Sequence, residues 1–163
     1  RGATAIGEQF NKSAEWAQQL IDNFYKSFPK INQYRLKIEN MAETYGYVTT
    51  ITGRKRRLPD MQLEDKDDYR YQEAHRQSLN SVIQGSSADI MKLSMIAIYN
   101  DPRYKALDCH MIITVNDELI MEVPEDHIKE GAELLVGTMK RVGHSLIDLP
   151  MSVDAEVNDY WYG

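Results

Sequence analysis

The sequence has 163 residues, 42% of them hydrophobic, which is enough to bury the core of one domain or of two tightly joined subdomains. Its 19 basic and 25 acidic residues give a net charge of −6, which argues against a protein that coats nucleic acid by bulk electrostatic attraction but leaves room for a local basic patch. A single cysteine, Cys109, excludes an intrachain disulfide, and no run is long and apolar enough to span a bilayer, so we expect a soluble protein of a reducing compartment with no membrane partner.

The first part of the chain is predicted to be helical. Ser13 is a suitable N-cap, and apolar residues recur from Trp16 to Phe28 at the spacing of one helical face. Pro29 is expected to begin a second helix, and Gly46 to end it as the C′ residue. We expect the aromatic residues of these two helices to pack helix against helix rather than to stack on bases.

A basic hairpin loop is predicted at residues 47–58. A β-branched run leads to a turn at Gly53, and four consecutive basic residues follow, namely Arg54, Lys55, Arg56 and Arg57. Such runs are commonly solvated loops. The functional alternative is a loop that contacts the phosphate backbone of nucleic acid. An acidic, polar linker is expected to join this hairpin to the next helix.

Residues 73–99 are predicted to form a helical region with a break at Gly85. Its first part would run to about Ile83, and its second part would restart at Ser86 or Ser87 with apolar residues all around the axis, which is typical of a buried helix. Because glycine has no Cβ, Gly85 would let another group approach the backbone closely.

Three hydrogen-bond donors lie four residues apart in this region, namely Arg76, Asn80 and Gln84. At about 100° per residue they fall within about 80° of one another on one helical face. The row is either a solvated polar face or a reader of duplex DNA. Every base pair presents purine N3 or pyrimidine O2 acceptors in the minor groove, so such donors could sense duplex geometry without reading sequence, as a template-copying enzyme must.

The stretch HMIITVNDELIMEVP, residues 110–124, predicts a β-hairpin. Asn116 and Asp117 form an ordinary turn signal, because Asn and Asp tolerate positive φ, and Glu118 adds a second carboxylate at the tip. A helix over residues 124–146 and a last strand at residues 151–157 are expected to follow. The predicted fold class is α+β, with helices packed on a small antiparallel sheet.

Four segments, in order along nearly the whole chain, resemble family A DNA polymerases, the bacterial polymerase I type that also includes phage enzymes. The segment after the family's nucleotide-binding helix is similar to FYKSFPKI followed by GYVTTITGRKRRLPD. The helix pair that ends the fingers and enters the palm is similar to RQSLNSVIQGSSADIMKL. Motif C resembles VNDELIMEVP, and the family's closing strand and aromatic end are similar to VDAEVNDYWYG.

The resemblance implies a palm-type subdomain with a helical remnant of the fingers. Residues 1–70 would be the remainder of the fingers, including the basic hairpin loop 47–58, and residues 71–163 would be the C-terminal part of the palm. The family's other metal-binding aspartate and its nucleotide-gripping helix have no counterpart here. The chain, which begins at Arg1 rather than Met, would therefore be the C-terminal part of a polymerase, either truncated or naturally split, and inactive by itself.

By the same resemblance, the two carboxylates would be catalytic. Asp117 would be a ligand of Mg²⁺ in a two-metal site that this chain supplies only in part, and Glu118 would give electrostatic support beside it. Asn116 stands where the family usually has His. It could still donate a hydrogen bond to the primer terminus, but it cannot carry a positive charge, so that contact should be slightly weaker.

The implied partners are primer-template DNA, a dNTP and the missing N-terminal part of the polymerase, in the cytoplasm of a bacterial or phage-infected cell. The residues expected to contact the minor groove are Arg76, Asn80 and Gln84. The residues expected to hold backbone phosphate are Arg54, Lys55, Arg56 and Arg57. The isolated chain is also expected to self-associate, because the hairpin strand would leave an unsatisfied edge.

Two other functions stay open. A catalytically silent DNA-binding module would keep the donor row but not its chemistry, and the presence of both Asp117 and Glu118 counts against it. A metal-dependent nuclease would need Asp108 or Asp89 to join these carboxylates. We expect Asp108 to lie near the far end of its strand from the turn, and Asp89 to favour a helix N-terminus.

Overall fold

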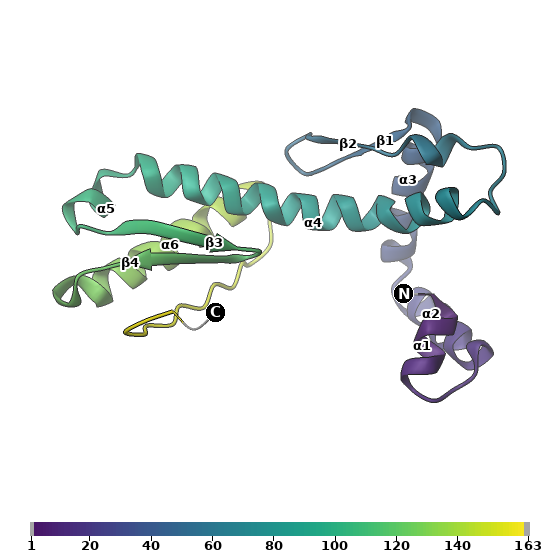
Figure 1. Ribbon diagram of the computed structural model, residues 1–163, viewed down its shortest axis with the longest axis horizontal. Helices are drawn as coiled ribbons and strands as arrows, with labels where there is room; N and C mark the ends of the chain where they lie inside the picture. Colours follow the sequence, from purple (N-terminus) through teal and green to yellow (C-terminus); the bar gives the residue numbers. More distant parts are fainter. Residues whose placement is uncertain (1, 162–163) are drawn as a thin grey trace. The chain divides into compact units, whose positions relative to one another are not determined.

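The computed structural model describes residues 2–161, which are mostly helical (Figure 1). The α-helices are α1 (Ala3–Gln9), α2 (Ala14–Ser27), α3 (Pro29–Tyr45), α4 (Tyr69–Asn100), α5 (Pro102–Ala106) and α6 (Ile128–Leu146). Short 3-10 helices are η1 (Pro59–Gln62) and η2 (Glu125–His127). The strands are β1 (Tyr47–Thr49), β2 (Lys55–Arg57), β3 (His110–Val115) and β4 (Glu118–Glu122).

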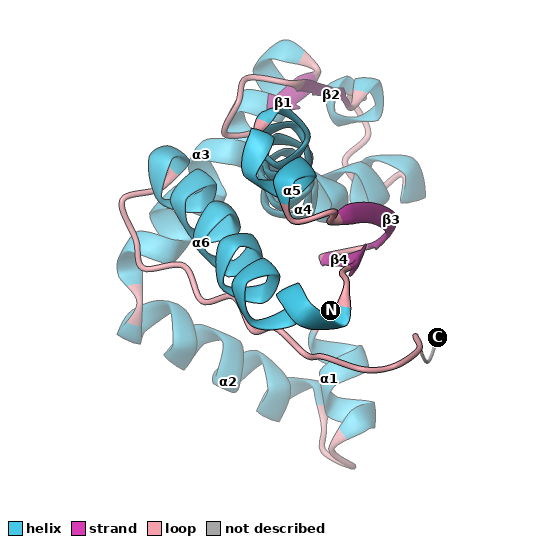
Figure 2. Cartoon of the chain, turned by 90° about the vertical axis from the view of Figure 1, so that its left-hand side faces the viewer, coloured by secondary structure: helices cyan, strands magenta, loops and turns pink. Residues whose placement is uncertain are grey.

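Within the described residues, the strands form two separate two-stranded sheets, β1 with β2 and β3 with β4 (Figure 2). The predicted class of helices with small antiparallel sheet is therefore confirmed. The chain divides into two units. Unit 1 comprises the residues up to Val48 and Arg57–Leu79, and unit 2 comprises Thr49–Arg56 and the residues from Asn80 on. The assignment of residues 1–70 to fingers and 71–163 to palm stays a prediction.

Local sequence signals set the ends of the helices in unit 1. The Ser13 side chain accepts a hydrogen bond from the Trp16 backbone N–H at 3.2 Å, so α2 begins at the predicted cap. Pro29 is the first residue of α3, and Gly46 follows that helix in the left-handed conformation, with φ of 69°. Both predicted boundaries are confirmed.

The packing expected for the aromatic residues of these helices is confirmed only in part: the rings of Trp16 and Phe10, from different helical segments, lie 6.2 Å apart, but the aromatic residues are not buried within the described residues. Their side chains keep between 38% and 52% of their surface exposed, namely those of Trp16, Phe24, Phe28 and Tyr34. Helical spacing correctly identified an apolar stripe, but a stripe is buried only where a second element covers it.

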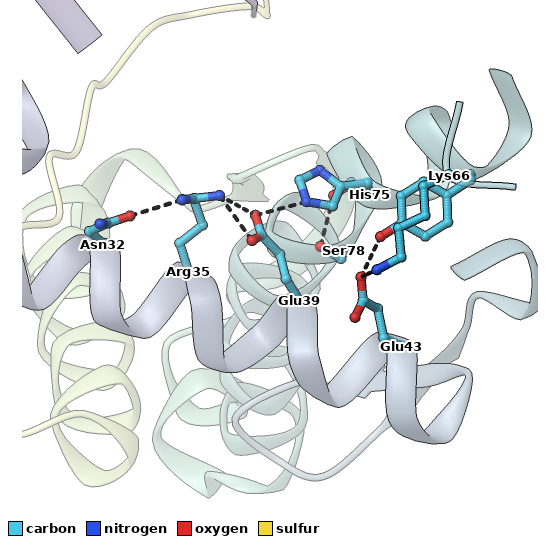
Figure 3. Close-up of polar contacts among 8 residues, drawn as sticks. Asn32, Arg35, Glu39, Glu43, Lys66, His75 and Ser78 are labelled. Atoms are coloured by element: carbon cyan, nitrogen blue, oxygen red, sulfur yellow. Dashed lines mark hydrogen bonds and ion pairs between the residues drawn. The ribbon is translucent and has the colours of Figure 1, made fainter. Parts of the chain in front are cut away.

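Polar contacts join α3 to the first part of α4 within unit 1 (Figure 3). The Glu43 carboxylate accepts hydrogen bonds from Lys66 Nζ at 2.8 Å and from the Tyr71 hydroxyl, and Lys66 and then Tyr71 lower the pKa of that carboxyl. One turn earlier on α3, Glu39 lies 3.4 Å from the ring of His75. These contacts tie two helices together at their polar edge.

Unit 2 has an apolar core that seats the β3–β4 hairpin against helices. Its fully buried members are Ile98, Tyr104, Leu107 and Cys109. Side chains that pack on them come from β3, β4, the segment after β4 and α6, namely Met111, Leu119, Met121, Val123, Leu134 and Leu135. The hairpin is therefore held by packing along one face, which fixes where its tip lies within this unit.

Two predicted features of the backbone are wrong. Helix α4 starts at Tyr69 and continues through Gly85 without a break, because one helical glycine costs only about 1 kcal/mol relative to alanine. Residues 151–158 form no strand in the described part, because a strand requires a hydrogen-bonded partner that alternation alone does not provide. Instead, Met151 packs so closely on α6 that a Cβ at Gly143 would lie 2.7 Å from Met151 Cγ.

Tyr162, within the aromatic end that resembles the family's, lies outside the described residues. Between residues 2 and 161, no helix is both long enough and apolar enough to cross a membrane.

Candidate functional site

The candidate catalytic carboxylates lie at the tip of the β3–β4 hairpin. Val115 and Glu118 form the last pair of the antiparallel register, so Asn116 and Asp117 make a two-residue turn. Asn116 has φ of 52°, a left-handed conformation that Asn adopts at low cost. The Thr114 hydroxyl donates to the Glu118 carbonyl at 3.2 Å, a further hydrogen bond at the base of the turn. The predicted turn is confirmed.

The side chains of Asn116, Asp117 and Glu118 are all exposed. Within residues 2–161, neither carboxylate has a hydrogen bond or an ion pair, so both keep their oxygens available to a ligand. In the same range, no three His, Cys, Asp or Glu side chains are grouped so that they could hold a metal ion.

The two acids that a nuclease would add are placed elsewhere. Asp108 precedes β3, at the end of the hairpin opposite the tip, and its carboxylate lies 2.9 Å from Nε2 of His110. Asp89 lies in the interior of α4 rather than at a helix N-terminus, so that expectation is wrong. Asp89 is 6% exposed, and its carboxylate accepts hydrogen bonds from Thr52 and Arg54.

The three donors of the predicted row all lie on α4 and are exposed. Arg76 is paired with Glu73 at 2.5 Å, one turn earlier, in an exposed ion pair of a kind that contributes little stability and that a stronger acceptor could replace. In the described residues, the side-chain amides of Asn80 and Gln84 have no hydrogen-bond partner. Their roles in DNA binding stay predictions.

The four consecutive basic residues divide into two groups. Lys55, Arg56 and Arg57 form β2, and all three are exposed. Arg54 precedes that strand, and its guanidinium has two partners on α4. Its Nε donates to Asp89 Oδ1 at 2.8 Å, and its Nη2 donates to the Gly85 carbonyl at 3.0 Å.

Sequence reasoning missed this contact between the loop and α4, although one signal was present. Gly85 was expected to allow a close approach, and a Cβ there would lie 2.7 Å from Thr50 Cγ2, so the group that approaches is the tip of the chain's own basic hairpin. Burial raises the pKa of Asp89, but hydrogen bonds from Thr52 and Arg54 outweigh it, so the net pKa lies below the ordinary value and the carboxylate stays charged.

The sequence pattern of DNA polymerase family A matches residues 1–163. The chain belongs to this family. Among family A relatives, DNA polymerase I of Chloroflexus aurantiacus is 34% identical over 98% of the chain. The thermostable DNA polymerase I of Thermus filiformis is 33% identical, also over 98%. The chain spans only 16% and 18% of the lengths of these two polymerases.

One solved polymerase-domain structure has a similar fold over the matched part. It is the POL domain of Pol1 from M. smegmatis in complex with a DNA primer-template and dNTP, with a TM-score of 0.78 and 30% sequence identity. The match covers 86% of this chain and 24% of that one. Family membership and the similar fold agree with the order of the four sequence segments.

Proposed function

We propose that this chain contributes to template-directed DNA synthesis, the transfer of a nucleotide to a primer 3′ end, as the C-terminal part of a family A DNA polymerase. The observation that carries the proposal is the hairpin tip, which presents Asp117 and Glu118 side by side, exposed and unpaired within the described residues. A turn whose register is fixed by packed strands is a suitable support for carboxylates that must meet a reacting group.

The donor atoms at the tip fit Mg²⁺. This ion prefers oxygen ligands and is commonly held by one or two carboxylates together with water and substrate phosphates, so Asp117 is a suitable protein ligand and Glu118 a suitable neighbour. When bound, Mg²⁺ supplies activation of the primer 3′ hydroxyl and neutralises charge on the leaving pyrophosphate. The remaining protein ligand would come from the part of the polymerase outside this sequence.

The other residues bind and orient the DNA. Asn116 donates a hydrogen bond to the primer terminus. Exposed donors on α4 contact minor-groove acceptors of the newest base pair and the template, namely Arg76, Asn80 and Gln84. Basic residues of the 47–58 loop hold backbone phosphate, with Lys55, Arg56 and Arg57 on β2 the most accessible, and Arg54 able to do so only through the part of its guanidinium that Asp89 leaves open.

The proposed partners are primer-template DNA, a dNTP and the N-terminal portion of the polymerase, and the proposed location is the cytoplasm. The chain by itself would not extend a primer. By the family resemblance, it supplies only one of the two metal-binding aspartate positions, and it has no counterpart of the helix that grips the incoming nucleotide.

Mg²⁺-dependent primer extension tests the proposal. The 163-residue chain is assayed by itself and joined to the N-terminal portion of its polymerase, with Asp117→Asn as the test variant. Asp108→Asn is the matched control, because it removes a carboxylate from the other end of the same hairpin. We expect no extension by the lone chain, and extension by the joined protein that Asp117→Asn abolishes and Asp108→Asn preserves.

Other results would point to other functions. Extension by the lone chain would show that its own acids complete the metal site. A joined protein that binds primer-template equally well with and without Asp117 and never extends it would be the silent DNA-binding module.

A further inference from the structure

A cluster of polar groups joins the tip of the basic hairpin to α4 inside unit 2. Asp89 accepts a hydrogen bond from the Thr52 hydroxyl at 2.6 Å and one from Arg54 Nε at 2.8 Å. Arg54 also donates to the Gly85 carbonyl at 3.0 Å. On the same stretch of α4, Ser86 Oγ accepts a hydrogen bond from the Ile51 backbone N–H at 2.9 Å.

Burial, hydrogen bonding and shape all indicate that this cluster is a specific structural contact. Asp89 is 6% exposed, and a buried carboxylate is costly unless charged or polar donors satisfy it, as Thr52 and Arg54 do here. The absence of a side chain at Gly85 is also required, because a Cβ would lie 2.7 Å from Thr50 Cγ2 and 3.4 Å from Arg54 Nη2. Charge, hydrogen bonds and shape all hold one loop on one turn of helix.

This turn of α4 begins directly after Gln84, and the strand that leaves the loop carries Lys55 and Arg56. We propose that Arg54 and Asp89 are positioning residues that lock the basic hairpin to α4, so that the phosphate contacts of β2 and the minor-groove contact of Gln84 keep a fixed spacing on bound duplex. The inference rests on the proposed function, and it assigns Arg54 mainly to Asp89 rather than to DNA.

Overall electrostatics and the positioning role predict opposite changes in DNA affinity when Asp89 loses its charge. Removing the negative charge of Asp89 would tighten DNA binding if only overall charge mattered, because DNA is a polyanion. If Asp89 acts by holding Arg54 and the loop, the same change weakens binding. The two effects oppose each other, so the direction of the change separates them.

The experiment measures primer-template affinity against salt for the polymerase that contains this chain. The test variants are Asp89→Asn, Arg54→Gln and the double variant, and the contrast is Arg56→Gln, a basic residue on β2 with an exposed side chain. Gln84→Ala tests the minor-groove contact itself. Thermal unfolding confirms that each variant is folded at the assay temperature, and Thr52→Val, which removes one hydrogen bond to Asp89, replaces any variant that is not.

We expect Asp89→Asn and Arg54→Gln each to weaken binding by roughly 2- to 30-fold, and the double variant to be no weaker than the weaker single variant, since both break one contact. Their plots of log affinity against log salt should keep the wild-type slope. Arg56→Gln should instead reduce that slope by about 0.9, the value for one lost phosphate contact.

Provided that Gln84→Ala weakens binding, either of two results would overturn the positioning role. One is tighter or unchanged binding by Asp89→Asn, and the other is a reduced salt slope for Arg54→Gln. If wild type and Gln84→Ala bound equally, the minor-groove part of the proposed function would fail, and the inference with it.

Discussion

At the scale of single residues, the hairpin tip depends on one backbone conformation. Asn116 has φ of 52°, where a β-branched side chain is strongly disfavoured. The residue that allows the turn thus directly precedes Asp117 and lies two residues before Glu118, the two candidate catalytic carboxylates. The stability of the hairpin and the placement of the carboxylates therefore both require a residue that adopts the left-handed conformation at position 116.

Replacing Asn116 should separate the conformational requirement from side-chain chemistry. We expect Asn116→Val to lower the free energy of unfolding by about 1–2 kcal/mol, because a left-handed conformation costs about that much for a side chain with a branched Cβ. Asn116→Gly, which adopts this conformation freely, should change stability little. Urea denaturation of the three proteins measures the difference, and equal midpoints would contradict the argument.

A second residue-scale prediction concerns acid stability. Hydrogen bonds from Arg103 lower the pKa of Asp101 from 3.8 to about 2. Because the folded-state pKa is the lower one, the charged carboxylate stabilises the fold above about pH 4, and this contribution is lost as the pH falls through about 2. Asp101→Asn keeps an acceptor at the N-cap of α5 but cannot titrate.

Thermal unfolding between about pH 4 and pH 2 gives the measurement, with the window set by these two pKa values. The midpoint temperature of the wild type should fall more steeply than that of Asp101→Asn. Parallel curves would mean that Asp101 has nearly the same pKa in the folded and unfolded chains.

At the scale of elements, Gly85 of α4 and Gly137, one of the glycines of α6, have opposite surroundings. A Cβ at Gly85 of α4 would lie 2.7 Å from Thr50, whereas a Cβ at Gly137 of α6 would meet nothing within 4 Å. Helix propensity by itself favours alanine at both sites by about 1 kcal/mol. The environment of each helix decides whether that gain is realised.

We therefore expect opposite effects from one substitution. Gly137→Ala should stabilise the chain by about 0.5–1 kcal/mol. Gly85→Ala should destabilise it by about 1–3 kcal/mol, because the added methyl group must displace the hairpin loop. Chemical denaturation of both variants tests this, and stabilisation by Gly85→Ala would show that the loop does not rest on α4 as described.

At the scale of the whole molecule, the chain carries apolar surface that its own described elements leave uncovered. Ile112, the bulge residue of β3, is 54% exposed, and in the described residues β3 pairs with β4 along one edge. An open strand edge with apolar side chains is a site of association between chains.

The isolated chain is accordingly predicted to self-associate with rising concentration. Ile112→Lys should shift sedimentation toward the monomer in analytical ultracentrifugation, because charge blocks pairing at an edge strand. Ile96→Lys is the matched control, since Ile96 is 56% exposed but lies on α4. A monomer at every concentration, or equal effects of the two variants, would contradict association through the β3 edge.

The sequence by itself determined the features whose causes are local. Ser13, Pro29 and Gly46 act through hydrogen bonds and backbone conformations within a few residues, so the helix ends were predictable. The hairpin tip was predictable for the same reason, because Asn116 and the alternation around it specify a turn. Family A membership followed from the order of four such local segments.

Only the tertiary structure decided what distant residues do for one another. Arg54 and Asp89 are 35 residues apart, and no local pattern distinguishes a phosphate-binding arginine from one that satisfies a buried carboxylate. Gly85 is a packing site rather than a helix break, and residues 151–158 lack a strand in the described part. Contacts of this kind depend on which surfaces meet in space, and that is settled by the packing of the whole fold.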